Sequence, residues 1–141
     1  MIKEDFVSFE LAKLLREKGF NEFCYYYYME NGGIKLTNND KEHNFYPRPT
    51  LQMAMKWLRE VHNIDIDITA QVGMLQVKRY VPSVETYNPK FDEELGKNRL
   101  NQKSHSTSKP LKGEILPVYE DFATYEEACE AGIKYCLENL V

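Results

Sequence analysis

The stretch at residues 50–62, TLQMAMKWLREVH, constrains the fold more than any other part of this sequence. On a helical wheel it carries one broad apolar stripe, and Met53 and Trp57 form a second stripe beside it. The broad stripe contains Leu51, Ala54, Met55, Leu58 and Val61. A helix that is apolar over most of its circumference has to be covered on more than one side. We therefore predict that this helix lies between layers of a small domain and that Thr50 caps it.

The chain before this central helix predicts another helix and a β-hairpin. The helix covers residues 5–18, with Asp5 or Ser8 as its N-cap and Gly19 as its stop. Its predicted buried side chains are Phe6, Leu11, Ala12, Leu14 and Leu15.

The hairpin consists of an aromatic-rich strand at residues 23–29, the turn Asn31-Gly32-Gly33 and a short strand at residues 34–36. Residues 38–49 are polar and contain two prolines near their end, so we predict a loop there.

The chain after the central helix begins with two predicted strands. Isoleucine alternates with polar residues over residues 64–69, which is the period of a half-buried strand. Gly73 interrupts this pattern, and a second strand covers residues 74–81 and ends at Pro82.

The end of the chain predicts an insertion, a third strand and a last helix. Residues 88–112 carry few large apolar side chains, which is typical of a flexible insertion or a lid. A short edge strand follows at residues 114–119. Thr124 and Glu127 form a capping box that opens a last helix reaching Leu140. Together these elements predict a single α+β domain over residues 1–141, an antiparallel sheet packed by the central and terminal helices, in the order α-β-β-α-β-β-(insertion)-β-α.

Charge argues against general nucleic-acid binding. The net charge is −4, and the one basic stretch, residues 88–112, falls in a predicted loop instead of on a folded element. The second half of the chain has the helix, three strands and helix of double-stranded-RNA-binding domains. Those domains place lysines at the start of their last helix, whereas this one offers Glu126, Glu127 and Glu130. We therefore find no strong nucleic-acid signal.

Cysteine content and the N-terminus indicate a cytoplasmic protein. Cys129 and Cys136 are about 10.5 Å apart along the last helix, too far for a disulfide. The start of the chain, MIKEDF, has acidic residues where a signal peptide needs an apolar run, and no stretch approaches about 18 apolar residues. We expect a reduced cytosolic compartment, no membrane contact and no cofactor.

Three segments, VSFELAKLLREKGF, PTLQMAMKWLREVHNI and TYEEACEAGIKYCLENLV, carry a resemblance to known proteins. Together they resemble small uncharacterised proteins of gut Bacteroidales and their phages or mobile elements. All three are predicted helices, so the resemblance concerns the scaffold and transfers no catalytic residue. It implies a cytoplasmic setting, the host cytoplasm if the protein is phage-encoded. Small accessory phage proteins often act by binding, either blocking a host protein or sequestering a signalling nucleotide.

Tyrosines at positions 25–28 give the leading functional hypothesis. Tyr26 and Tyr28 share one face of a strand, where they can stack on a base or support self-association. The alternative is core on one face and ordinary surface on the other. Lys97, Arg99 and Lys103 in the insertion can close over a phosphate, or they can simply be solvated. The hypothesis is a non-catalytic, homo-oligomeric accessory protein that sequesters a small anionic, nucleotide-like ligand used as a host-defence signal.

The acidic last helix gives a second hypothesis. Glu126, Glu127, Glu130 and Glu138 can face a basic host protein, which makes the chain a protein-interaction module that inhibits or recruits that protein. In the same helix Ala128 and Gly132 form a small-residue pair. This pair allows close approach either to the chain's own sheet or to the helix of a second copy.

A third hypothesis is a metal-dependent hydrolase. His62, Asp65 and Asp67 have a spacing that can gather metal ligands where a helix turns into a strand. The alternative is an exposed strand face next to a histidine at a helix C-terminus. No CxxC, HExxH, Walker loop or GxSxG pattern occurs, so we predict neither an enzyme nor a resident metal.

Overall fold

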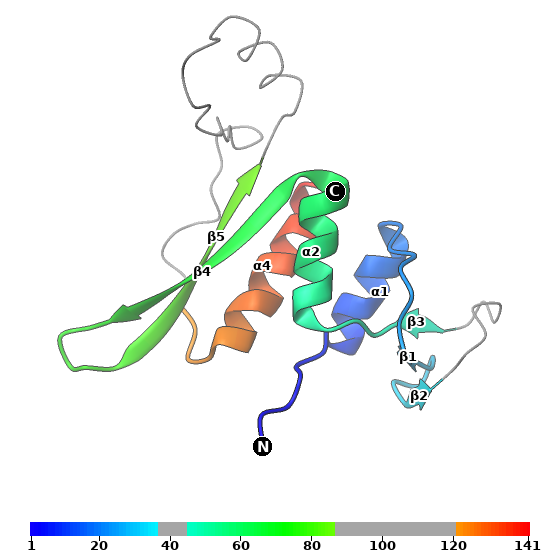
Figure 1. The fold of residues 1–141 in the computed structure, drawn as a ribbon, viewed down its shortest axis with the longest axis horizontal. Coiled ribbons are helices and arrows are strands. Elements are labelled where there is room, and N and C mark those ends of the chain that lie inside the picture. Colours follow the sequence, from blue (N-terminus) through cyan, green and yellow to red (C-terminus); the bar gives the residue numbers. More distant parts are fainter. Residues whose placement is uncertain (37–44, 87–120) are drawn as a thin grey trace, which may run out of the picture.

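A layer of helices separates a short sheet from a long β-hairpin in the computed structural model (Figure 1). The structure describes residues 1–36, 45–86 and 121–141. The helices in these ranges are α1 (Phe9–Glu17), α2 (Leu51–His62) and α4 (Tyr125–Asn139). The strands in these ranges are β1 (Tyr26–Tyr28), β2 (Ile34–Leu36), β3 (Tyr46–Pro47), β4 (Ile64–Val72) and β5 (Lys78–Thr86). This combination of helices and antiparallel strands confirms the predicted α+β class. The insertion predicted at residues 88–112 and the strand predicted at residues 114–119 lie outside the described residues.

Helix α1 begins at Phe9, later than predicted. Its N-cap is Ser8 and not Asp5, because the Ser8 hydroxyl accepts a hydrogen bond from the Leu11 N–H at 3.2 Å. The predicted stop is confirmed, since Gly19 has the left-handed φ of 93° that ends a helix.

The residues before Ser8 are extended because they pair with the segment that leads into α2. Phe6 forms an antiparallel bridge with Thr50, and the Val7 N–H donates to the Pro49 carbonyl at 3.1 Å. Phe6 is therefore not part of the buried helical face to which the sequence pattern assigned it. A tertiary pairing replaces the first turn of the predicted helix.

One antiparallel sheet was predicted, but the described strands form two, because the hairpin before α2 pairs with β3 and not with β4 or β5. The short sheet has the strand order β2-β1-β3 and is antiparallel throughout. Its hairpin turn is the predicted one, and Gly32 there has a φ of 82°. Strand β3 was missed, since residues 38–49 were predicted to be a loop. Pro47 fits in β3 because the neighbouring Arg48 N–H donates to the Tyr26 carbonyl at 3.1 Å, so the Pro47 nitrogen points away from β1.

The long hairpin pairs β4 with β5 from Ile64 opposite Thr86 to Val72 opposite Lys78. The predicted second strand is displaced, because β5 starts at Lys78 and runs through Pro82. Tyr80 directs its N–H and carbonyl to Phe122 on the outer edge, at 2.9 and 2.8 Å. Pro82 lies two residues further on and faces the same edge, so it interrupts no bond to β4.

Helix α2 has the predicted N-cap, because the Thr50 hydroxyl accepts from the Met53 N–H at 3.1 Å. Its inner face packs on β4 and α4, and Phe20 covers Trp57 with ring centroids 5.3 Å apart. Cover on more than one side was predicted, and it is confirmed for Trp57 of the second stripe, which is 5% exposed. The cover is incomplete, because Met53 and Val61 remain 41% and 54% exposed.

Helix α4 packs closely on the long hairpin. A Cβ added at Gly132 would lie 2.9 Å from Ile66 Cγ2 and 3.6 Å from Pro82 Cβ. Gly132 therefore contacts this chain's own strands, and Ala128 is fully buried, so the alternative of a second copy packing at this small-residue pair is wrong. Side chains of the three described helices and the long hairpin meet in the core, including Leu11, Leu15, Leu58, Ile64, Ile133 and Leu137. Among the described residues, no helix is long and apolar enough to cross a membrane.

Candidate functional site

An acidic groove of about 500 Å³ lies where α1, α4 and the N-terminal segment meet. Its apolar lining consists of Phe6, Leu11, Leu14, Leu51, Phe122 and Ala131. Its charged lining consists of Asp5, Glu10, Glu126, Glu127, Glu130 and Lys134. Five carboxylates and a single lysine give the groove a strongly negative rim above an apolar floor.

Ser8 links the two helices that form the walls of the acidic groove. Its backbone N–H and its hydroxyl both donate to the Glu130 carboxylate, the hydroxyl at 3.3 Å. Burial raises the pKa of Glu130, and the Ser8 hydrogen bonds partly offset this by favouring the ionised form. Glu130 therefore holds the walls together, whereas Asp5, Glu10 and Glu127 are exposed to solvent.

The start of α4 places two further glutamates at the groove. The Thr124 hydroxyl accepts from the Glu127 N–H at 3.1 Å, which confirms the predicted N-cap. Glu126 and Glu127 lie in the first turn, where the positive end of the helix dipole stabilises carboxylates. A smaller cavity of about 240 Å³ shares Asp5, Leu51 and Glu126 with the groove and extends it to the N-terminus of α2.

Glu138 does not belong to this site. It was predicted to act with the three glutamates at the start of the last helix, but it does not line the groove. Its position is about 12 Å further along the helix axis than Glu130, because each helical residue adds about 1.5 Å. Glu138 is exposed in the last part of α4.

Tyr26 and Tyr28 lie on one face of β1, and this face packs against the N-terminal segment. The Tyr28 hydroxyl donates to the Val7 carbonyl at 2.6 Å. The Tyr26 ring meets the Phe6 ring edge-on, with centroids 5.7 Å apart. The Tyr28 hydroxyl is thus engaged within the fold, whereas Tyr26 contacts Phe6 and remains 40% exposed.

Arg48 lies among the same aromatic rings, and sequence reasoning assigned it only to a loop. Its guanidinium carbon is 4.0 Å from the Phe6 centroid, 5.5 Å from Tyr28 and 5.8 Å from Tyr26. These are cation–π distances, so the positive charge of Arg48 is attracted to the electron-rich faces of the rings. The other predicted ligand-binding residues, Lys97, Arg99 and Lys103, lie outside the described residues.

The metal site considered for His62 does not form. His62 packs on Trp57 with ring centroids 4.6 Å apart, its Nε2 is buried without a hydrogen-bond partner, and burial lowers its pKa. Asp65 and Asp67 are exposed on β4. Across residues 1–36, 45–86 and 121–141, no three or more His, Cys, Asp or Glu side chains are placed to hold a metal ion.

Comparison of the chain with protein-family models, curated proteins and solved structures gives no match. Sequence reasoning identified Glu126, Glu127 and Glu130, since they are acidic residues in the first two turns of one predicted helix. It missed the groove that these glutamates share with other segments, including Asp5, Phe6, Glu10 and Phe122. The only sequence signal among these four was Glu10 in the first turn of α1, and an acidic residue is ordinary at a helix start.

Proposed function

We propose that this chain is a protein-interaction module whose acidic groove binds a basic, amphipathic segment of a partner protein. The observation that supports this proposal is the set of five carboxylates bordering an apolar floor within about 500 Å³. A segment with cations on one side and apolar side chains on the other satisfies both parts of the groove. Its cations stay near the carboxylates while its apolar side chains leave water.

An anionic ligand fits this groove poorly, because its phosphates would lie close to several carboxylates. The nucleotide-sequestering function stays a prediction. It depends on Tyr28, whose hydroxyl is bonded within the fold, on Tyr26, which is 40% exposed beside Phe6, and on cations outside the described residues. In the setting that the sequence resemblance implies, the partner is a host protein that the module inhibits or recruits, and this setting also stays a prediction.

Fluorescence polarisation with two synthetic peptides tests the proposal. The first is a labelled helical peptide of lysine and leucine with one cationic face, and the second has glutamate in place of each lysine. We expect the lysine peptide to bind and the glutamate peptide not to bind. Binding should weaken as salt shortens the Debye length from about 10 Å at 0.1 M to about 3 Å at 1 M.

Two charge reversals on the same helix locate the binding site. Glu127→Lys lies in the acidic groove, and Glu138→Lys is the matched control, since both glutamates are exposed on α4. We expect Glu127→Lys to weaken peptide binding by about 1 kcal/mol, roughly fivefold, and Glu138→Lys to leave it unchanged. Circular dichroism checks that both variants fold. Equal affinity in the two variants, or binding of both peptides alike, contradicts the proposal.

A further inference from the structure

Four apolar side chains at the turn between β4 and β5 are exposed to solvent. This apolar tip consists of Val72, Met74, Leu75 and Val77, and Met74 and Leu75 are 102% and 88% exposed. The turn is hydrogen-bonded, since the Gly73 N–H donates to the Val77 carbonyl at 3.2 Å. Figure 1 shows this end of the hairpin extending away from the helices. A contiguous apolar cluster on a defined turn is typical of an interaction surface.

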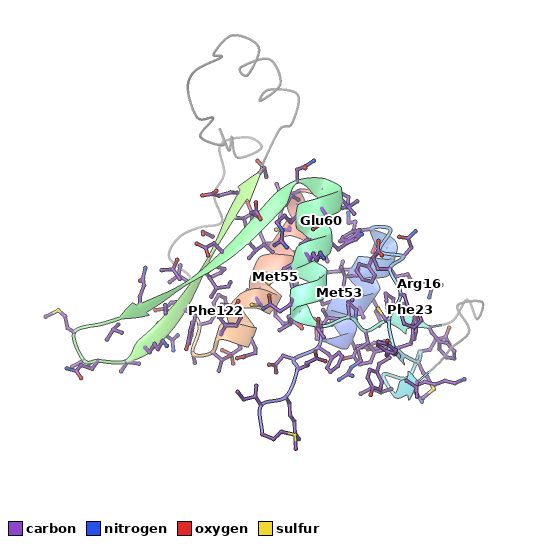
Figure 2. The ribbon with its side chains drawn as sticks, viewed as in Figure 1. Arg16, Phe23, Met53, Met55, Glu60 and Phe122 are labelled. Carbon is purple, nitrogen blue, oxygen red and sulfur yellow. The ribbon has the colours of Figure 1, made fainter. Side chains whose placement is uncertain are left out.

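A second groove lies on the outer face of α2. This apolar groove has a volume of about 480 Å³, and buried Trp57 forms its floor. Exposed apolar side chains line it at Phe23, Met53 and Val61. Figure 2 shows Phe23 beside the face of α2 that carries Met53. Clefts of about 300–1,000 Å³ can enclose a drug-sized ligand. The apolar groove is in this range, so it can accommodate two apolar side chains of a binding partner.

The charges beside the apolar tip and the apolar groove have opposite signs. Lys78 is exposed directly after the tip. Arg79 follows it and pairs with Asp121 at 3.1 Å. Glu22 and Glu60 border the apolar groove, with Lys56 as its only cation among the described residues. A tip that enters such a groove brings Lys78 toward a rim with excess negative charge.

We propose that the apolar tip of one copy of this chain inserts into the apolar groove of a second copy, and that the second copy reciprocates. The two surfaces are convex and concave, both are apolar, and their flanking charges are complementary. The tip does not line the groove of its own chain. A reciprocal exchange closes a two-fold dimer in which each tip and each groove is occupied. This interface is separate from the acidic groove and does not depend on the peptide-binding function.

Oligomeric state in three single variants tests the proposal. Leu75→Lys places a charge in the tip, Met53→Lys places one in the groove, and Leu36→Lys is the control at an exposed leucine on β2. Sedimentation velocity should give a dimer for the wild type and for Leu36→Lys. It should give monomers for Leu75→Lys and Met53→Lys. A monomeric wild type, or dimers in either interface variant, overturns the proposal.

Mixing the two monomeric variants distinguishes reciprocal insertion from other dimers. Leu75→Lys retains an intact groove and Met53→Lys retains an intact tip, so the mixture keeps one complete tip–groove contact per pair. We expect the mixture to form heterodimers although neither variant associates alone. In a different dimer, α2 of one copy could pack on α2 of the other. Every heterodimer would then carry the Met53→Lys lysine in its interface, so mixing the two variants would not increase association. A mixture that stays monomeric overturns the proposal.

Trp57 provides a second measurement because it is the only tryptophan in the chain and closes the groove. Diluting the wild type should shift its emission because the partner's apolar tip leaves the groove that Trp57 lines, and the emission of Leu75→Lys should not depend on concentration. Sedimentation with phosphatidylserine vesicles tests the other apolar occupant of the tip. Vesicle binding that Leu75→Lys abolishes, with a wild type that is monomeric without lipid, assigns the tip to a membrane and overturns the proposal.

Discussion

Replacing Gly132 with alanine tests how closely α4 packs on the long hairpin. The added Cβ would lie 2.9 Å from Ile66 Cγ2. Carbon atoms pack at about 3.5–4.0 Å, so the hairpin has to shift by about 0.6 Å or more. Overpacking of this kind costs about 1–3 kcal/mol, and alanine returns about 1 kcal/mol because it is the better helix former. We expect Gly132→Ala to lower the free energy of unfolding by up to about 2 kcal/mol.

A double-mutant cycle with Ile66→Ala separates these two contributions. Ile66→Ala removes the methyl group that clashes, so in that background Gly132→Ala should raise the free energy of unfolding by about 1 kcal/mol. The coupling energy between the two positions should then be about 1–3 kcal/mol. Urea unfolding followed by circular dichroism gives all four values.

Gly73→Ala is the matched control for the same chemical change. No heavy atom lies within 4 Å of its added Cβ, so its effect should stay within about 0.5 kcal/mol. If Gly132→Ala stabilises the wild type as much as it stabilises the Ile66→Ala variant, the two sites are uncoupled. That result would show that Gly132 is not packed closely against Ile66.

Two further predictions concern buried titratable groups. Burial holds the pKa of His62 below 6.5, so the unfolded chain takes up a proton first as the pH falls. The unfolding free energy should therefore drop as the pH falls below about 6.5. His62→Phe should reduce this drop. Equal pH dependence of the unfolding free energy in both proteins, measured by urea unfolding, would show that His62 does not cause it. Burial raises the pKa of Cys129 to about 11 and of Cys136 to about 12, so both thiols should react with Ellman's reagent only when urea unfolds the chain. Release of two thiols in native buffer would show that α4 does not pack as described.

Local features of the chain were predictable from sequence. Thr50 and Thr124 were identified as N-caps, and Asn31-Gly32-Gly33 as a hairpin turn, because each of these structures forms through hydrogen bonds within a few residues. The alternation after α2 likewise identified β4, since side-chain direction in a strand depends only on position along it.

Pairing between distant segments changed several boundaries. The segment before α1 looked helical, yet Val7 pairs with Pro49 and remains extended. Pro82 looked like a strand end, yet β5 continues through it. The Pro82 nitrogen faces the outer edge of the hairpin, so its missing N–H removes no hydrogen bond to β4. Local propensity is weak compared with these tertiary hydrogen bonds, so it does not decide such positions.

The sequence by itself determined the helix caps, the turn at Asn31-Gly32-Gly33 and the α+β class, because these follow from contacts within a few residues and from local periodicity. Only the tertiary structure decided which surfaces form sites. Glu10 and Glu127 border one groove because α1 and α4 pack together, although these residues lie far apart in the chain. Met53 and Val61 belong to apolar stripes, and they are exposed because no described element covers that face. Burial depends on which distant segments meet, and helical periodicity carries no information about that.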